Sequence, residues 1–244
     1  LLPIGGGIIA GGGFQIAGGQ ALDGIAAGSG SAWTPLGGVS DLAMGPAGSF
    51  TDLATANGVF YGICEYWEVD ITVGVLGRLD WAADHWQWQR LDYAAWNGRL
   101  ETIGQDLFAI DGDQVIRWYP HNGVHTPLPG LDLDGAIYGS CVHMGDLVIS
   151  GDFTANAGAP CGKVLRYAGG AWQDLGAPPG SAIVEQVASL EGAGLVACYR
   201  TSYGARQRVA LFDGSQWTDL GGDFDGPVSR MVLHRGRLFV GGSF

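Results

Sequence analysis

The hydrophobic positions of the chain form short runs that each end in a turn residue. In the clearest copy, apolar residues 231–233 lead to a turn at Gly236, and a second run over 238–240 enters Gly241 and Gly242. The second run of each copy begins at Ile8, Val59, Leu107, Leu147, Leu195 and Leu238. These starting points lie roughly 40 to 50 residues apart, a spacing that indicates a repeat protein.

A second pair of short strands follows in each of the first five copies. In the fifth copy, Phe212 precedes an Asp-Gly turn at Asp213, and Trp217 and Leu220 follow the turn. Asp-Gly supplies the left-handed backbone that tight hairpins require. Tryptophans at the same position of other copies are Trp33, Trp88 and Trp172, and the third copy replaces this tryptophan. Each complete copy therefore predicts four short strands, called a to d in chain order.

Four strands in each copy, with no helical periodicity between them, exclude βαβ units. Radial repetition of four-stranded sheets hides their edges from solvent. We therefore predict an all-β fold, a β-propeller of four-stranded antiparallel blades. A β-sandwich is the structural alternative, although a sandwich does not need five matching copies.

The repeats predict one propeller domain over residues 1–244. Its expected units are residues 1–49, 50–98, 99–135, 136–182, 183–227 and the partial unit 228–244. The expected a strands lie near Leu1, Phe50, Arg99, Ala136, Ile183 and Val228. Five units and two strands of a sixth predict six blades or an arc of a larger ring. Because the sequence stops within an apolar strand pattern at Phe244, we expect it to be an excerpt of a longer protein.

An apolar strand that ends in Gly-Gly, an aromatic residue before a turn, and Trp shortly before Leu together resemble the kelch motif. Gly241 and Gly242, with the segments 167–175 and 212–220, carry this likeness. The sequence of these segments is most similar to the extracellular kelch-like repeats of galactose oxidase type and of fungal cortical polarity markers. The resemblance implies a propeller fold and an extracellular or cell-surface location.

Composition narrows the classes of partner. The chain has 44 glycines among 244 residues without a Gly-X-Y period, which argues against long helices and excludes collagen. Its 24 acidic and 12 basic residues give a net charge of -12. Such a surface repels phosphate backbones, so no nucleic acid partner is expected. No apolar run is long enough for membrane insertion.

Loop lengths predict which side of the propeller binds a partner. The a-to-b and most c-to-d turns are tight, whereas the b-to-c connections (15–21, 66–72, 154–162) and the d-to-a connections (37–49, 129–135) are long. Strand alternation places both long classes on one rim, the long-loop rim, where we expect function. Its acidic residues are Asp41, Glu65, Glu68, Asp70, Asp92, Asp132, Asp134, Asp152, Asp223 and Asp225. Such a rim tolerates a cation, a basic protein patch or a neutral glycan.

Tryptophans on this rim are the first candidates for contact with a partner. The tryptophans of the repeat motif, and Trp86 beside Trp88, are predicted to pack between blades. The remaining candidates are Trp67, Trp81, Trp96 and Trp118, for which packing is the alternative role. Trp67 and Trp96 fall in rim loops, and the predicted binding residues are Trp67, Trp96, Glu68, Asp70 and Asp92.

Two d-to-a loops end in alternating carboxylates beside glycine. They contain Asp132 with Asp134, and Asp223 with Asp225. Carboxylate oxygens are hard ligands for calcium, so these four residues are the candidate metal ligands, and apart from calcium at these residues no cofactor is expected. The alternative is that they are turn residues that cap a loop.

Other chemistry finds less support in the sequence. His121 and His125 have helical metal-site spacing, but Pro120 and Pro127 forbid that helix. The four cysteines show no CxxC spacing, and both a disulfide such as Cys141 with Cys161 and buried thiols stay open. No phosphate-binding glycine loop precedes a helix, and no GxSxG motif occurs.

We expect a non-catalytic extracellular or surface scaffold that binds protein or carbohydrate through its long b-to-c and d-to-a loops. One alternative is a galactose oxidase-like or glycan-processing enzyme, although the expected inner strands supply only Cys141 and His143 together. Another is a structural module of a large surface or virion protein.

Overall fold

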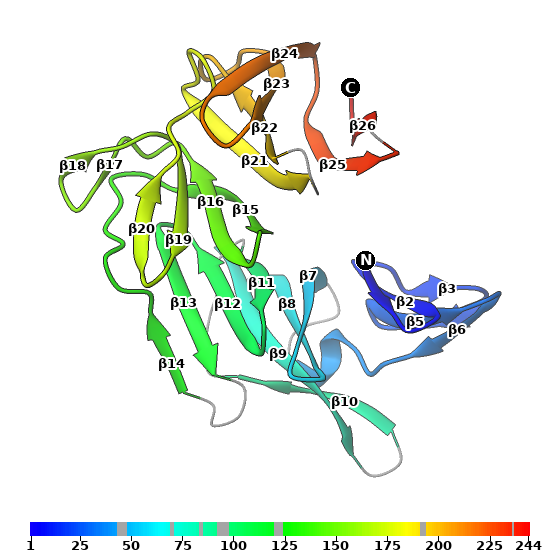
Figure 1. Cartoon of the computed structure of the whole chain (residues 1–244). Coiled ribbons are helices and arrows are strands. Elements are labelled where there is room, and N and C mark those ends of the chain that lie inside the picture. The colour runs from blue at the N-terminus through cyan, green and yellow to red at the C-terminus, as the bar shows by residue number, and fades with distance from the viewer. Residues whose placement is uncertain are drawn as a thin grey trace. The chain divides into compact units, whose positions relative to one another are not determined.

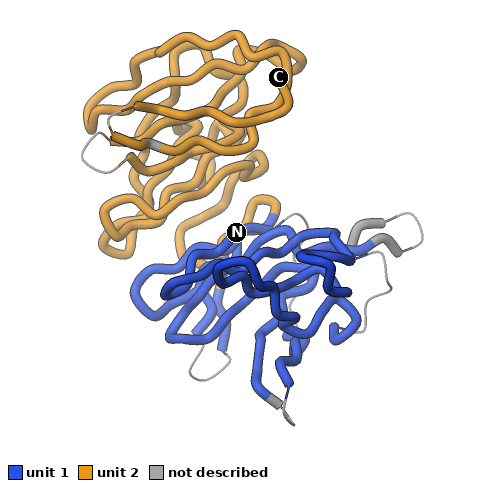
Figure 2. Tube along the Cα trace, turned by 90° about the vertical axis from the view of Figure 1, so that its right-hand side faces the viewer, with its two compact units in different colours: residues 1–111, 116–126 blue, residues 112–115, 127–244 orange. Residues whose placement is uncertain are grey.

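A computed structural model describes residues 1–42, 48–68, 71–82, 85–91, 98–119, 124–190, 194–235 and 237–244. These residues form β-strands and one short 3-10 helix, η1 (Val39–Leu42) (Figure 1). The chain divides into two compact units, residues 1–111 with 116–126 and residues 112–115 with 127–244 (Figure 2). No helix in the described ranges is long and apolar enough to cross a membrane.

Five four-stranded sheets follow one another along the chain, numbered here in chain order. Sheet 1 contains β1 (Leu2–Ile4), β2 (Gly7–Gly11), β5 (Ile25–Ser29) and β6 (Ala32–Pro35). Sheet 2 contains β7 (Ser49–Ala56), β8 (Val59–Glu68), β9 (Ile71–Ala82) and β10 (His85–Arg90). Sheet 3 contains β11 (Arg99–Ile103), β12 (Asp106–Asp111), β13 (Gln114–Tyr119) and β14 (Val124–Pro127).

The second unit holds the remaining sheets. Sheet 4 contains β15 (Ile137–His143), β16 (Asp146–Gly151), β19 (Val164–Ala168) and β20 (Ala171–Asp174). Sheet 5 contains β21 (Ile183–Leu190), β22 (Gly194–Arg200), β23 (Gln207–Phe212) and β24 (Trp217–Phe224). Sheet 6 has the two strands β25 (Val228–His234) and β26 (Arg237–Gly242). The order a-b-c-d within each complete sheet confirms the predicted all-β fold of four-stranded antiparallel, blade-like sheets.

Two of the b strands, one in each unit, are buried on both faces. Residues 61–64 of β8 and 195–199 of β22 are all buried, although side chains alternate between the faces of a strand. A strand is covered in this way when its sheet has neighbours on both sides. The uninterrupted apolar runs in the sequence therefore reflect sheets that stack face to face.

Two of the repeated tryptophans join consecutive sheets, one in each unit. In the first unit, the indole Nε1 of Trp88 donates a hydrogen bond of 2.9 Å to the Leu36 carbonyl of sheet 1. In the second unit, Trp217 donates in the same way to the Leu175 carbonyl of sheet 4, at 2.8 Å. The predicted packing of these two tryptophans between sheets is confirmed.

Four of the a strands contain a β-bulge at the same place. Their register shifts at the second or third residue, so one residue is left without a direct partner in the b strand. The bulged residues are Thr51, Tyr138, Glu185 and Ser229. A bulge redirects the side chain of the extra residue, and bulges are frequent beside binding sites.

The predicted long b-to-c connection at residues 66–72 is wrong. β8 and β9 stay paired as far as Glu68 and Ile71, because aromatic and β-branched residues there favour strand. In sheet 3, the b and c strands are separated by Gly112 and Asp113 alone. In sheets 1 and 4, the connection instead forms a small hairpin, β3 (Ile16–Ala17) with β4 (Gln20–Ala21) and β17 (Ala155–Asn156) with β18 (Ala159–Pro160).

Candidate functional site

The predicted binding residues are concentrated in sheet 2 and the connection that follows it. Asp70, Asp92 and Trp96 lie outside the described residues. Trp67 and Glu68 form the end of β8, and their backbones pair with β9. The side chains of these two residues also lie outside what the structure describes. All five assignments stay predictions.

Of the candidate calcium ligands, Asp134 is the one whose carboxylate is most fully engaged. It accepts the backbone N–H groups of Thr154 and Ala155, at 2.7 and 2.9 Å, and the Thr154 hydroxyl at 2.6 Å. The Thr154 contacts, followed by the Ala155 N–H, lower the pKa of Asp134 to about 2. These contacts attach the loop before β15 to the β17–β18 hairpin, as the loop-capping alternative proposes.

Two of the other candidate calcium ligands make contacts through their backbone atoms. The Asp132 N–H donates to the side chain of Asn156 at 2.8 Å. The Asp223 carbonyl accepts from Arg206 at 3.4 Å, and Asp223 has a φ of 96°. Asp225 is exposed in the connection between β24 and β25. Within the described ranges, no three or more His, Cys, Asp or Glu side chains gather as metal ligands would. A calcium site at these aspartates stays a prediction.

Two of the four candidate contact tryptophans have described side chains, and they differ. Trp118 is buried, and its ring stacks on His125 with centroids 5.0 Å apart, so its role is packing. Trp81 is 60% exposed at the end of β9, and its edge contacts Trp86 across the hairpin. Sheet 3 thus has a ring pair as sheets 4 and 5 do, but its tryptophan is on the c strand and a histidine is on the d strand.

The cysteines and the inner-strand histidine form no reactive cluster in the described residues. None of the four cysteines is in a disulfide. Burial raises the pKa of both Cys64 and Cys198 to about 12, which makes these thiols poor nucleophiles. His143 shares a hydrogen bond of 2.9 Å with the Ser189 hydroxyl on the next sheet.

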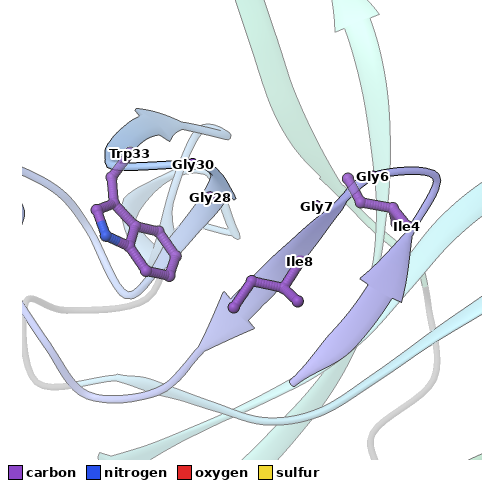
Figure 3. Close-up of a pocket in the computed structure, with 7 residues that line it drawn as sticks. All are labelled: Ile4, Gly6, Gly7, Ile8, Gly28, Gly30 and Trp33. Carbon is purple, nitrogen blue, oxygen red and sulfur yellow. The ribbon is translucent and has the colours of Figure 1, made fainter.

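A hollow of about 410 Å³ lies beside the tight turns of sheet 1. Figure 3 shows Trp33 on one side of it and the β1–β2 hairpin, with Ile4 and Ile8, on the other. Gly28 is the cross-strand partner of Trp33, whereas the corresponding partners of Trp172 and Trp217 are Tyr167 and Phe212. The Trp33 ring lies directly against Gly28, where an added Cβ atom would be 2.9 Å from it.

A polar and aromatic group lies on the long-loop rim of the second unit, where sheets 4 and 5 meet. We call Tyr138, Asp152 and Tyr203 the tyrosine–aspartate cluster. One oxygen of Asp152 accepts both phenolic hydroxyls, from Tyr203 at 2.8 Å and from Tyr138 at 3.2 Å. Its other oxygen accepts the Ala136 N–H at 2.8 Å. Tyr138 is 40% exposed and Tyr203 is 74% exposed, so both rings are open to solvent.

The three members come from different parts of the repeat. Tyr138 is the bulged residue of β15, Asp152 directly follows β16, and Tyr203 lies in the loop between β22 and β23. Burial and the Asp152 charge raise the pKa of Tyr138, and the hydrogen bond to Asp152 raises the pKa of Tyr203. Both phenols therefore keep their protons near neutral pH and act as donors.

The neighbouring bulged residue, Glu185 of β21, forms an ion pair with an arginine. Arg200 lies 2.9 Å from it, and the buried Gln207 donates an amide N–H to its other oxygen. The carbonyl oxygen of the Gln207 side chain accepts the Val228 N–H of sheet 6. These contacts fix the rim of sheet 5 beside the cluster and leave Glu185 a structural role.

Lys163 bonds to the backbone next to the Asp152 side chain. This residue is buried, and its ammonium group donates to the backbone carbonyls of Asp152 at 3.0 Å and Phe153 at 3.3 Å. Phe153 is fully buried, so the chain directly after the Asp152 side chain is anchored. The cluster is held by sheet, loop and lysine together.

Sequence reasoning placed Asp152 on the rim but missed both tyrosines. Tyr138 becomes visible only once the bulge is known, and Tyr203 only once its loop is seen to reach the preceding sheet. No family model matches this chain, and no curated protein matches it. The interpretation of the site therefore depends on its geometry and charge.

Proposed function

We propose that this chain is a non-catalytic interaction scaffold, extracellular or at a cell surface, that binds protein or glycan through the long-loop rim. The single observation that carries the proposal is the tyrosine–aspartate cluster. Exposed aromatic faces beside a fixed carboxylate offer both apolar contact and directed hydrogen bonding, which is the composition of recognition surfaces.

The stacked sheets support this proposal because they hold the rim rigidly. Each cluster residue is attached to a strand end or to a short loop, so little conformational freedom is lost when a partner binds. The kelch-like signature of the repeats, similar to galactose oxidase-type and cortical-marker repeats, is the basis for proposing the kelch-like family and the extracellular location.

The proposal is tested by exchanging loops on the two rims. Residues 201–206, which carry Tyr203, are replaced by a Gly-Ser linker of equal length. The matched control replaces Gly169 and Gly170, the c-to-d turn of sheet 4 on the opposite rim, by Asn-Gly. Each purified protein is screened against an array of glycans and of extracellular protein domains.

We expect the unaltered chain and the c-to-d turn variant to bind the same array members, and the loop variant to lose them. Equal binding by both variants would contradict the assignment to the long-loop rim. The absence of any bound array member for the unaltered chain would favour the structural-module alternative.

A further inference from the structure

The charge of the Asp152 carboxylate indicates which class of ligand the cluster binds. Its carboxylate accepts one backbone N–H and two phenols, all of them neutral donors. In the described residues, no arginine or lysine lies within ion-pair distance of this carboxylate. Lys163 bonds to the backbone carbonyl of Asp152 instead. Asp152 thus presents a negative charge that the described part of the chain does not pair.

The arginines of the third strands show the contrast. In sheets 2 to 5, the c strand carries an arginine that forms an ion pair with an aspartate of its own sheet. These pairs are Arg78 with Asp80, Arg117 with Asp106, Arg166 with Asp146, and Arg208 with Asp219. Four aspartates of the sheets therefore have a cation, whereas the rim aspartate of the cluster has none among the described residues.

The tyrosine rings add a second attraction for a cation. An aromatic face carries partial negative charge and attracts an ammonium or guanidinium group placed over it. A phenol that donates a hydrogen bond to a carboxylate has a more electron-rich ring, which strengthens this attraction. Both hydroxyls of the cluster donate to one oxygen of Asp152, and both rings are exposed.

We propose that the tyrosine–aspartate cluster of Tyr138, Asp152 and Tyr203 binds a lysine or arginine side chain in a basic segment of a partner protein. The cation lies against the tyrosine faces and next to the Asp152 carboxylate. The inference rests on the proposed function and specifies the chemical class of the partner. The net charge of -12 steers a basic segment toward the chain and away from polyanions.

A neutral sugar is the competing ligand, because it also stacks on tyrosine and bonds to a carboxylate. The two ligands respond differently to charge. Asp152→Asn keeps an acceptor oxygen for a sugar hydroxyl but removes the charge that a cation needs. Added salt screens a cation at this exposed site and has little effect on a neutral sugar.

The experiment titrates the whole chain with fluorescein-labelled ten-residue peptides of alternating Lys and Gly, Arg and Gly, and Glu and Gly. A panel of neutral oligosaccharides is titrated in parallel, and all titrations are repeated at low and high salt. The variants are Asp152→Asn, Tyr203→Ala and Tyr203→Phe. The matched control is Asp113→Asn, the same charge change on the exposed β12–β13 turn of the same unit.

The chain is expected to bind the two basic peptides and not the acidic one, and to bind more weakly at high salt. Asp152→Asn and Tyr203→Ala are each expected to weaken binding by roughly tenfold, and Tyr203→Phe, which keeps the ring, by less. Asp113→Asn is expected to leave binding unchanged. Because Tyr203 is an exposed loop residue, its variants should keep the unaltered melting temperature, which is measured for each protein.

Oligosaccharide binding that Tyr203→Ala abolishes and Asp152→Asn preserves would overturn the cation proposal and leave the proposed function intact. Basic-peptide binding that Asp113→Asn and Asp152→Asn weaken equally would show general attraction to an acidic surface and would also overturn it. If neither peptides nor sugars bind at low salt, the cation proposal fails. The proposed function fails with it only if the array screen described above also finds no partner.

Discussion

Sheets 4 and 5 contain the same motif, yet their tryptophans are held differently. Trp217 of sheet 5 donates its indole N–H to the Leu175 carbonyl of sheet 4, whereas the Trp172 indole N–H is buried and has no acceptor among the described residues. Each tryptophan packs against an aromatic ring of its own sheet, with ring centroids 5.1 Å apart in both pairs. The difference therefore lies in the segment of chain that directly precedes each sheet.

The sequence just before each sheet explains the contrast. Leu175 is followed directly by Gly176, whose φ of 74° turns the chain immediately after the acceptor carbonyl. Leu36 and Gly37, which serve Trp88, have the same arrangement, with a φ of 71°. Before sheet 4, Pro129 separates Leu128 from the left-handed Gly130. One inserted residue is enough to remove the acceptor while the ring packing is kept.

The largest effect is expected where both the ring and the hydrogen bond are fully buried. Trp88 is 1% exposed and also contacts Phe50, so Trp88→Ala should lower the free energy of unfolding by about 3–5 kcal/mol. The control is Trp81→Ala, which removes an indole that is 60% exposed and should change the free energy of unfolding by under about 0.5 kcal/mol. Urea unfolding followed by circular dichroism measures both, and equal losses would contradict stacking between sheets 1 and 2.

The next effect isolates the hydrogen bond. Trp217→Phe and Trp172→Phe remove the same ring volume, but the first also leaves the Leu175 carbonyl without its donor. Trp217→Phe should therefore lower the free energy of unfolding by about 1–3 kcal/mol more than Trp172→Phe does. The first change creates an unsatisfied carbonyl, whereas the second removes an indole N–H that is already unsatisfied in the described part of the chain. The same urea titration measures the difference, and a larger loss for Trp172→Phe would reverse the comparison.

The smallest effect concerns the loop that precedes sheet 4. Hydrogen bonds lower the pKa of Asp134 to about 2 from an ordinary 3.8, so its stabilisation is fully present above about pH 4 and is lost as the pH falls through 2. Asp134→Asn should lower the melting temperature at pH 6 by a few degrees. The difference in melting temperature should narrow below about pH 4 and close near pH 2, and a difference that does not change with pH would show that the charge is not involved.

The sequence predicts the strands and the tryptophan contacts well because both depend on local spacing. The starts of the b strands recur in each copy and the Trp-to-Leu spacing recurs in four copies, and the structure has the strands near the positions that the pattern indicates. The sequence predicts residues 154–162 as a long connection, whereas the structure has the hairpin β17–β18 there. Ala157 and Gly158 of this hairpin both have positive φ, which is typical of a tight hairpin turn. The Asn-Ala-Gly sequence at 156–158 was a signal for it.

The candidate site was less accessible to sequence reasoning. A bulge is a mismatch in residue count between two paired strands, so Tyr138 is identified only when the register with β16 is known. Tyr203 reaches Asp152 across 51 residues of sequence, and no local pattern specifies that contact. Local periodicity thus predicts the sheets, and the rim depends on contacts between sheets.

The most direct test of the stacked-sheet account is hydrogen exchange at the indole N–H groups, measured by NMR on the chain with 15N-labelled tryptophan and assigned by single Trp→Phe variants. We expect the Trp88 and Trp217 signals to exchange slowly, because each is bonded to a carbonyl of the preceding sheet, and the Trp81 signal to exchange rapidly. Exchange of Trp88 and Trp217 as fast as that of Trp81 would show that these rings do not lie between sheets.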